Sequence, residues 1–145
     1  MARLVPSMAG HWVKRLDEIP LVPEEEPGDP LWYPLQHHFG FTAFGANVYT
    51  APEAEGSLIG DHDEADSEQE ELYLVTAGSA RFTIDGQDEL AAAGTVVAIT
   101  DPAVRRSAIA AEPGTTLVVV GGRRAPAFES SWHGQHFTDV PTAYG

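Results

Sequence analysis

The stretch Glu70-Glu71-Leu72-Tyr73-Leu74-Val75-Thr76-Ala77-Gly78 decides the fold. Its centre, Leu72 to Thr76, is rich in the apolar, aromatic and β-branched residues that favour strands, and Gly78 is a turn residue that closes it. Side chains alternate along a strand, so Glu71, Tyr73 and Val75 share one face. The stretch therefore predicts a strand that carries a carboxylate among apolar side chains.

Similar short segments flank this strand on both sides, separated by turn signals such as Asp85-Gly86, Asp101-Pro102 and Pro113-Gly114. The other expected strands lie within Phe39–Tyr49, Ala80–Ile84, Gln87–Leu90, Thr95–Ile99, Arg105–Ala111 and Thr116–Val120. Short strands at this spacing, with weak helical periodicity, predict a single-domain, all-β, antiparallel sandwich or barrel.

The ends of the chain have a different composition. Residues 1–38 form an expected N-terminal arm, because five prolines between Pro20 and Pro34 disfavour helices and central strands. Residues 39–122 are the expected core of the barrel. Residues 123–145 are an expected tail that covers the barrel with aromatic side chains, among them Phe128, Trp132, His133, His136 and Phe137.

Charge excludes several classes of partner. The 145 residues include 22 acidic and 8 basic ones, so the formal net charge is −14. Nucleic acid and anionic membranes would be repelled. The chain has no cysteine, which rules out thiolate metal sites and thiol nucleophiles, and fits a cytoplasmic protein. No apolar run is long enough for a signal peptide or a spanning helix.

The segment 53–71 contains nine acidic residues and no Lys or Arg. Such a run is typical of a solvated loop, but it could also supply carboxylates for a metal or for acid–base chemistry. The pair Asp61 and Asp63 does not continue into a calcium loop, since Ala65 and Asp66 occupy positions that need an oxygen ligand and a glycine.

The order and spacing of several residues resemble the two motifs of the cupin superfamily. The matching positions are Gly56, His62-Asp63-Glu64, Glu71 and Gly78 in the first motif, and Gly94, Asp101-Pro102 and about Arg105 in the second. The resemblance covers roughly residues 40–120. It implies a jelly-roll barrel, and it implies a homodimer formed through sheet edges and the N-terminal arm.

The same resemblance implies a degenerate metal site. Metal-loaded cupins use three His and one Glu, whereas this chain offers His62, Glu64 and Glu71, with Arg105 near the last His position. A guanidinium has no lone pair and would repel a cation. We therefore expect no cofactor and no redox metal, although a divalent metal on a His/carboxylate set stays open as an alternative.

The candidate site combines His62 and Glu71 as catalytic groups with Glu64, Tyr73 and Arg105 as ligand-binding groups. A His–carboxylate pair can move protons, and a carboxylate on the inner face needs a partner, for which Arg105 is the first choice. Strand alternation sends one of Arg105 and Arg106 inward, and the sequence leaves open which of the two. An inward Arg would favour an anionic small molecule. The alternatives are a solvated His62 and a purely structural ion pair.

Three functions follow, from different classes. The first is a small-molecule-binding protein without a redox metal. The second is a metal-independent isomerase or cyclase that uses His62 and a carboxylate, and the third is a divalent-metal enzyme. The sequence leaves open whether the chain is an enzyme.

Overall fold

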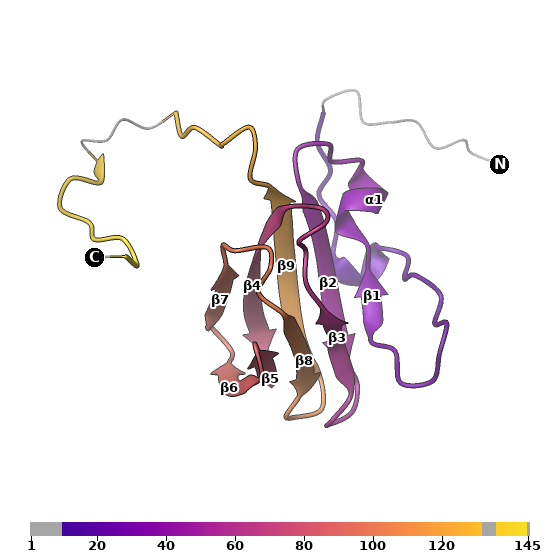
Figure 1. Ribbon diagram of the computed structural model, residues 1–145. Helices are drawn as coiled ribbons and strands as arrows, with labels where there is room; N and C mark the ends of the chain where they lie inside the picture. Colours follow the sequence, from indigo (N-terminus) through magenta and orange to yellow (C-terminus); the bar gives the residue numbers. More distant parts are fainter. Residues whose placement is uncertain (1–9, 132–135, 145) are drawn as a thin grey trace.

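Two antiparallel sheets face each other in the computed structural model, which describes residues 10–131 and 136–144 (Figure 1). One sheet has the strand order β1-β2-β9-β4-β7 and the other β3-β8-β5-β6. The elements are η1 (Leu16–Glu18), β1 (Leu31–Tyr33), α1 (Leu35–Phe39), β2 (Gly45–Ala51), β3 (Ser57–His62), β4 (Gln69–Ala77), β5 (Ser79–Ile84), β6 (Gln87–Ala92), β7 (Val96–Ile99), β8 (Arg106–Ala110) and β9 (Thr115–Arg123). The predicted all-β sandwich is confirmed, as two sheets that do not close into a barrel.

The core lies between the sheets. β4 places Tyr73 and Val75 inward, opposite Phe82 of β5, and Leu117 of β9 completes this layer; all four are at most 1% exposed. Alternation along β4 therefore sends the face that carries Glu71 toward the interior, as predicted.

Two glycine turns fix the edges of this core. Gly78 ends β4 with a φ of +70°, and a Cβ at this position would clash with Thr115, so only glycine fits. Asp85 and Gly86 both have positive φ and join β5 to β6, which confirms the predicted tight hairpin.

The segment between Leu31 and Gly45 differs from its prediction. Leu31–Tyr33, in the expected arm, forms β1 and pairs with β2. Leu35–Phe39 forms α1, which ends at Gly40 with a φ of +75°. The strand that was expected from Phe39 begins only at Gly45. Proline restricts the residue before it and lacks a donor, but neither effect prevents a three-residue edge strand or a helix that starts after Pro34.

Apart from β1, the described parts of the arm and the tail contribute no strand to the two sheets. The arm inserts Ile19, which is buried, and closes its loop with a hydrogen bond from Val22 N to the Trp32 carbonyl at 3.0 Å. In the tail Phe128 is exposed, and the Tyr144 hydroxyl lies 3.1 Å from Oγ1 of Thr100. Trp132 and His133 are outside the described residues.

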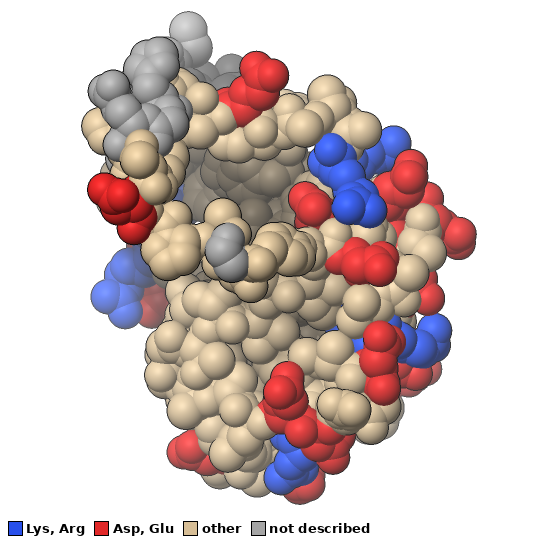
Figure 2. Space-filling model, turned by 60° about the vertical axis from the view of Figure 1, so that its left-hand side comes forward, with Lys and Arg blue, Asp and Glu red and all other residues tan. Residues whose placement is uncertain are grey.

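On the face shown in Figure 2, acidic side chains are spread around a broad uncharged area and do not gather in one patch. This distribution fits solvated surface charge. Within the described residues, no helix has the length and apolarity needed to cross a membrane. The expected homodimer remains a prediction.

Candidate functional site

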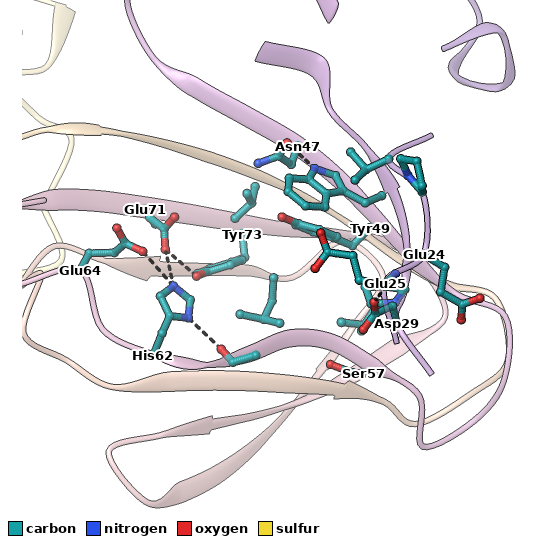
Figure 3. Close-up of a pocket in the computed structure, with 18 residues that line it drawn as sticks. Glu24, Glu25, Asp29, Asn47, Tyr49, Ser57, His62, Glu64, Glu71 and Tyr73 are labelled. Atoms are coloured by element: carbon teal, nitrogen blue, oxygen red, sulfur yellow. Dashed lines mark hydrogen bonds and ion pairs between the residues drawn. The ribbon is translucent and has the colours of Figure 1, made fainter. Parts of the chain in front are cut away.

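A cavity of about 450 Å³ lies between the sheets, with one wall formed by the arm (Figure 3). Its polar and aromatic lining comes from three places. The arm gives Glu24, Glu25, Asp29 and Trp32, β2 gives Asn47 and Tyr49, and the segment from β3 to β4 gives Ser57, His62, Glu64, Glu71 and Tyr73. This volume suits a small metabolite.

His62 lies at the end of β3, where the pairing with β8 is irregular. Its Nδ1 is 2.8 Å from the carbonyl oxygen of Gly60. A carbonyl can only accept, so Nδ1 carries the hydrogen. Nε2 therefore faces the acidic groups, at 2.9 Å from Oε2 of Glu64 and 3.8 Å from Oε1 of Glu71.

Glu64 belongs to the loop that follows β3, and two contacts hold it. Its backbone N–H donates to the Pro102 carbonyl at 2.8 Å, and the Ser67 hydroxyl donates to its Oε1 at 2.6 Å. This leaves Oε2 for His62. The predicted proximity of His62, Glu64 and Glu71 is therefore present in the structure, at one end of the cavity.

Glu71 and Tyr73 point inward from β4, as the alternation predicted. The side chain of Glu71 is 12% exposed, and the Tyr73 hydroxyl donates to its Oε1 at 2.6 Å. Burial, and then the hydrogen bond and the charge of Glu71, raise the pKa of Tyr73 above its ordinary value. Tyr73 is therefore a fixed donor that holds Glu71.

The cationic partner of Glu71 is Arg106, so the predicted pairing with Arg105 is wrong. Alternation in β8 sends Arg106 inward, where it is fully buried with Nη2 at 3.3 Å from Oε1 of Glu71. Arg105 precedes the strand and is 56% exposed, with ion pairs to Asp61 at 3.1 Å and Asp63 at 3.6 Å. Because Arg105 does not line the cavity, it gives no support for an anionic ligand.

The guanidinium of Arg106 also has a backbone partner. Its Nη1 donates to the Val104 carbonyl at 2.7 Å, while Nε and Nη2 have no hydrogen-bond partner within the described part of the chain. A buried guanidinium of this kind needs a carboxylate beside it, and Glu71 provides one.

The opposite end of the cavity contains groups that the sequence did not indicate. Trp32 donates from Nε1 to Oδ1 of Asn47 at 2.8 Å, and its ring centroid lies 5.8 Å from that of Tyr49. Burial, and then the charge of Glu71, raise the pKa of Tyr49 to about 12, so its hydroxyl stays protonated at neutral pH. Alternation along β2 could have indicated Asn47 and Tyr49 as inward neighbours, but no local signal marks the acidic arm.

The donors can be compared with what a metal would need. Ligand atoms of His62, Glu64 and Glu71 all lie within 4.8 Å of one another. One imidazole and two carboxylates suit a hard divalent cation better than copper or another soft metal. The buried charge of Arg106, which contacts Glu71, opposes a cation at this position.

Comparison with known proteins shows the fold. No model of a known protein family matches the sequence, and no curated protein matches it. The structure is similar to a sugar phosphate isomerase of the cupin superfamily from Silicibacter pomeroyi, with a TM-score of 0.61 and 21% identity over 75% of this chain and 74% of that one.

Two further solved structures agree. A cupin 2 conserved barrel domain protein from Salinispora arenicola has a TM-score of 0.62 and 18% identity over 79% of this chain and 91% of its own. The KdgF protein from Halomonas sp. has a TM-score of 0.58 and 13% identity, over 76% and 91%. The chain therefore has the cupin fold, and identities this low establish the fold alone.

Proposed function

We propose that this protein, built on the cupin fold, binds a small polar molecule in the cavity between its sheets and transfers a proton to or from it through His62 and Glu64. The observation that carries the proposal is the placement of one imidazole nitrogen. Nδ1 of His62 is occupied by the Gly60 carbonyl, while Nε2 is 2.9 Å from Glu64 at the cavity wall.

A pair at this distance shares one proton. With the proton present, the pair is an acid; without it, Nε2 and the carboxylate form a base. Because the hydrogen on Nδ1 is fixed, the proton that is transferred to or from the bound molecule resides on Nε2 of His62 or on an oxygen of Glu64. Fixing one nitrogen of an imidazole in this way is how proteins select the tautomer that reacts.

Glu71 has a supporting part in this proposal. Its Oε1 contacts the Tyr73 hydroxyl and Arg106, so the carboxylate is held in position beside His62. We therefore assign the proton exchange to His62 and Glu64, and we assign to Glu71 the stabilisation of a positive charge on the imidazole.

The reaction class is an isomerisation or cyclisation by proton transfer. The base would remove a proton from a carbon next to a carbonyl, and the same pair would return it to a neighbouring atom, so no other reactant is needed. The hydroxyl of Tyr49 is protonated at neutral pH and could donate to the oxygen on which charge develops. The activity named for the Silicibacter pomeroyi protein is also an isomerisation, which supports this class.

A second candidate is a site for a divalent cation held by His62, Glu64 and Glu71. The specific support is that their donor atoms lie within 4.8 Å and that the Nδ1 contact leaves Nε2 free to ligate. A cation there would act as a Lewis acid on an oxygen of the bound molecule. The buried Arg106 beside Glu71 makes this the weaker proposal.

NMR of the histidine ring protons tests the binding proposal. The His62 signals are assigned by their loss in His62→Gln, and pools of polar metabolites are then added at millimolar concentration. Binding in the cavity should shift the His62 signals and leave those of His37, which is exposed on α1, in place. Pools of sugars, polyols and amino compounds that all leave His62 unchanged would contradict the proposal.

A further inference from the structure

The walls of the cavity carry an unbalanced negative charge. Among the described residues that line it there are five carboxylates and no Lys or Arg. Figure 3 shows two groups of them, with Glu64 and Glu71 near His62 at one end, and Glu24, Glu25 and Asp29 together at the other. A ligand in this cavity would lie between two acidic ends.

The two ends of the cavity differ in whether their carboxylates have hydrogen-bond or ion-pair partners. Glu64 has His62 and Ser67 as partners, and Glu71 has Tyr73 and Arg106. At the arm, by contrast, the carboxylates of Glu24 and Glu25 have no hydrogen bond or ion pair within the part of the chain that the structure describes. Unpaired charge is therefore concentrated at the arm.

Hydrogen bonds fix the backbone of the arm at this end of the cavity, while the side chains of Glu24 and Glu25 are exposed. Oδ2 of Asp29 accepts hydrogen bonds from the backbone N–H groups of Glu25 at 3.1 Å and Glu26 at 2.9 Å. The loop is closed by the Val22 to Trp32 hydrogen bond and continues into β1, which pairs with β2. The backbone that carries Glu24, Glu25 and Asp29 is thus tied to the sheet through β1, and these residues line the cavity.

Aromatic rings form the wall next to the arm. Trp32 and Tyr49 lie at an interplanar angle of 40°, and the hydrogen bond to Asn47 fixes the Trp32 ring. Faces of Trp and Tyr rings attract cations, most strongly where water is excluded. Acidic groups and aromatic faces at one end of a cavity favour the same kind of ligand.

We infer that the cavity selects a small organic cation, an amine that also carries hydroxyl groups, with its ammonium group at the arm and its reacting part near His62. This inference rests on the proposed function, because it describes the ligand of the same site. The ammonium would replace its water shell with the carboxylates of Glu25 and Asp29 and the faces of Trp32 and Tyr49. Its hydroxyl groups would meet Ser57 and the phenol of Tyr49.

The same charges disfavour anions. Among the described lining residues, a phosphate in this cavity would face five carboxylates and no Lys or Arg. His62 already contacts Glu64 and Glu71, and the guanidinium of Arg106 is buried beside Glu71. This arrangement replaces the expectation of an anionic ligand, which depended on Arg105 facing inward.

Two matched ligand series test the inference at pH 7. The first is D-glucosamine, D-glucose and D-glucose 6-phosphate; the second is 2-amino-1,3-propanediol, glycerol and glycerol 3-phosphate. Each series changes the ligand charge from positive to zero to negative on nearly one framework. The dissociation constant is measured from the shift of the His62 ring signals. In at least one series the amine should bind about tenfold more tightly than the neutral compound, as expected for one charge-assisted contact, and the phosphate should not bind.

Two variants of the arm provide the matched control. Glu25→Gln removes a carboxylate that lines the cavity, and should weaken amine binding about tenfold while changing the neutral ligand less than about twofold. Glu26→Gln removes the same charge from the next residue, which does not line the cavity, and should change neither. Equal loss in both variants would show only a general effect of net charge and would overturn the inference.

The remaining outcomes separate this inference from the proposed function. If the neutral compound shifts the His62 signals as strongly as the amine does, the cavity binds small molecules but does not select cations, and only the inference fails. If a phosphate binds best, the inference is likewise overturned. If no compound of either series shifts the His62 signals at about 10 mM, the inference fails. The proposed function fails as well only if the metabolite pools also leave His62 unchanged.

Discussion

The guanidinium of Arg106 is completely buried, with its Nη2 3.3 Å from Oε1 of Glu71. The two residues come from opposite sheets, since Arg106 lies on β8 and Glu71 on β4. This ion pair connects the two layers of the sandwich directly behind His62. It fixes the carboxylate on which the arrangement of the candidate site depends.

Replacing Arg106 with Met should therefore be strongly destabilising. Removing one partner of a buried pair leaves an uncompensated charge, which costs about 3–5 kcal/mol of the free energy of unfolding. Arg105→Met is the matched control, because Arg105 is exposed and its ion pairs contribute about 1 kcal/mol or less. Urea unfolding of both variants measures the difference. Equal losses in the two variants would contradict the assignment of Arg106 as the buried partner.

The Tyr73 hydroxyl should contribute to stability through the same carboxylate. Tyr73→Phe keeps the ring in the core and removes the donor 2.6 Å from Glu71, so we expect a loss of about 1.5–3 kcal/mol, as for a hydrogen bond to a charged group. Thermal and urea unfolding provide the measurement. A variant as stable as the parent would show that this hydrogen bond makes no net contribution to the free energy of unfolding.

Alkaline conditions should destabilise the fold through Tyr49. Its pKa rises from 10.0 to about 12 on folding, so between these values the folded chain retains a proton that the unfolded chain has lost. The contribution is fully present below about pH 10 and is lost as pH rises toward about 12, with a slope of at most about 1.4 kcal/mol per pH unit.

Tyr49→Phe removes this titration. The free energy of unfolding should then fall less steeply between pH 10 and about pH 11.5 than in the parent protein. Parallel curves for the two proteins would indicate that Tyr49 ionises normally in the folded state.

Metal analysis should find no stoichiometric ion in protein purified without a histidine tag, because Arg106 already supplies a positive charge beside Glu71. The measurement is the metal content of the purified chain, with and without prior incubation with manganese or magnesium. One ion per chain that disappears in Glu64→Gln would favour the divalent-cation site instead.

The fold could be predicted because its signals are local. Leu72 to Thr76 is a run of apolar, aromatic and β-branched residues, and Gly78 and the Asp85-Gly86 turn mark places where the backbone needs positive φ. Such features need no knowledge of distant residues. The irregular region from Leu31 to Gly45 lacks a comparable pattern, and a helix of five residues leaves little periodicity to detect.

The position of Arg106 could not be read from β8 alone. Apolar side chains occur on both faces of this strand, with Ile109 on one and Ala108 and Ala110 on the other. Small residues face inward here because Phe82, which pairs with Ala108, already fills the interior. Which face of β8 points inward therefore depends on the neighbouring strand β5. A shift of one residue exchanges the two faces of a strand, so the sequence alone could not decide between Arg105 and Arg106.

The acidic arm was missed for a similar reason. Glu24 to Glu26 lie among prolines in a segment typical of solvated loops. Only the pairing of β1 with β2 brings this loop to the cavity, and a three-residue edge strand is too short to predict with its partner.

Hydrogen exchange between a bound molecule and solvent tests the role of His62 most directly. A pool of small hydroxylated carbonyl and amino compounds is incubated with the protein in D₂O, and loss of carbon-bound proton signals is followed by NMR. The parent protein should exchange a proton of at least one compound, His62→Gln should exchange it at least about a hundredfold more slowly, and His37→Gln should match the parent. No exchange with any compound, or equal exchange in His62→Gln, would contradict proton transfer at this site.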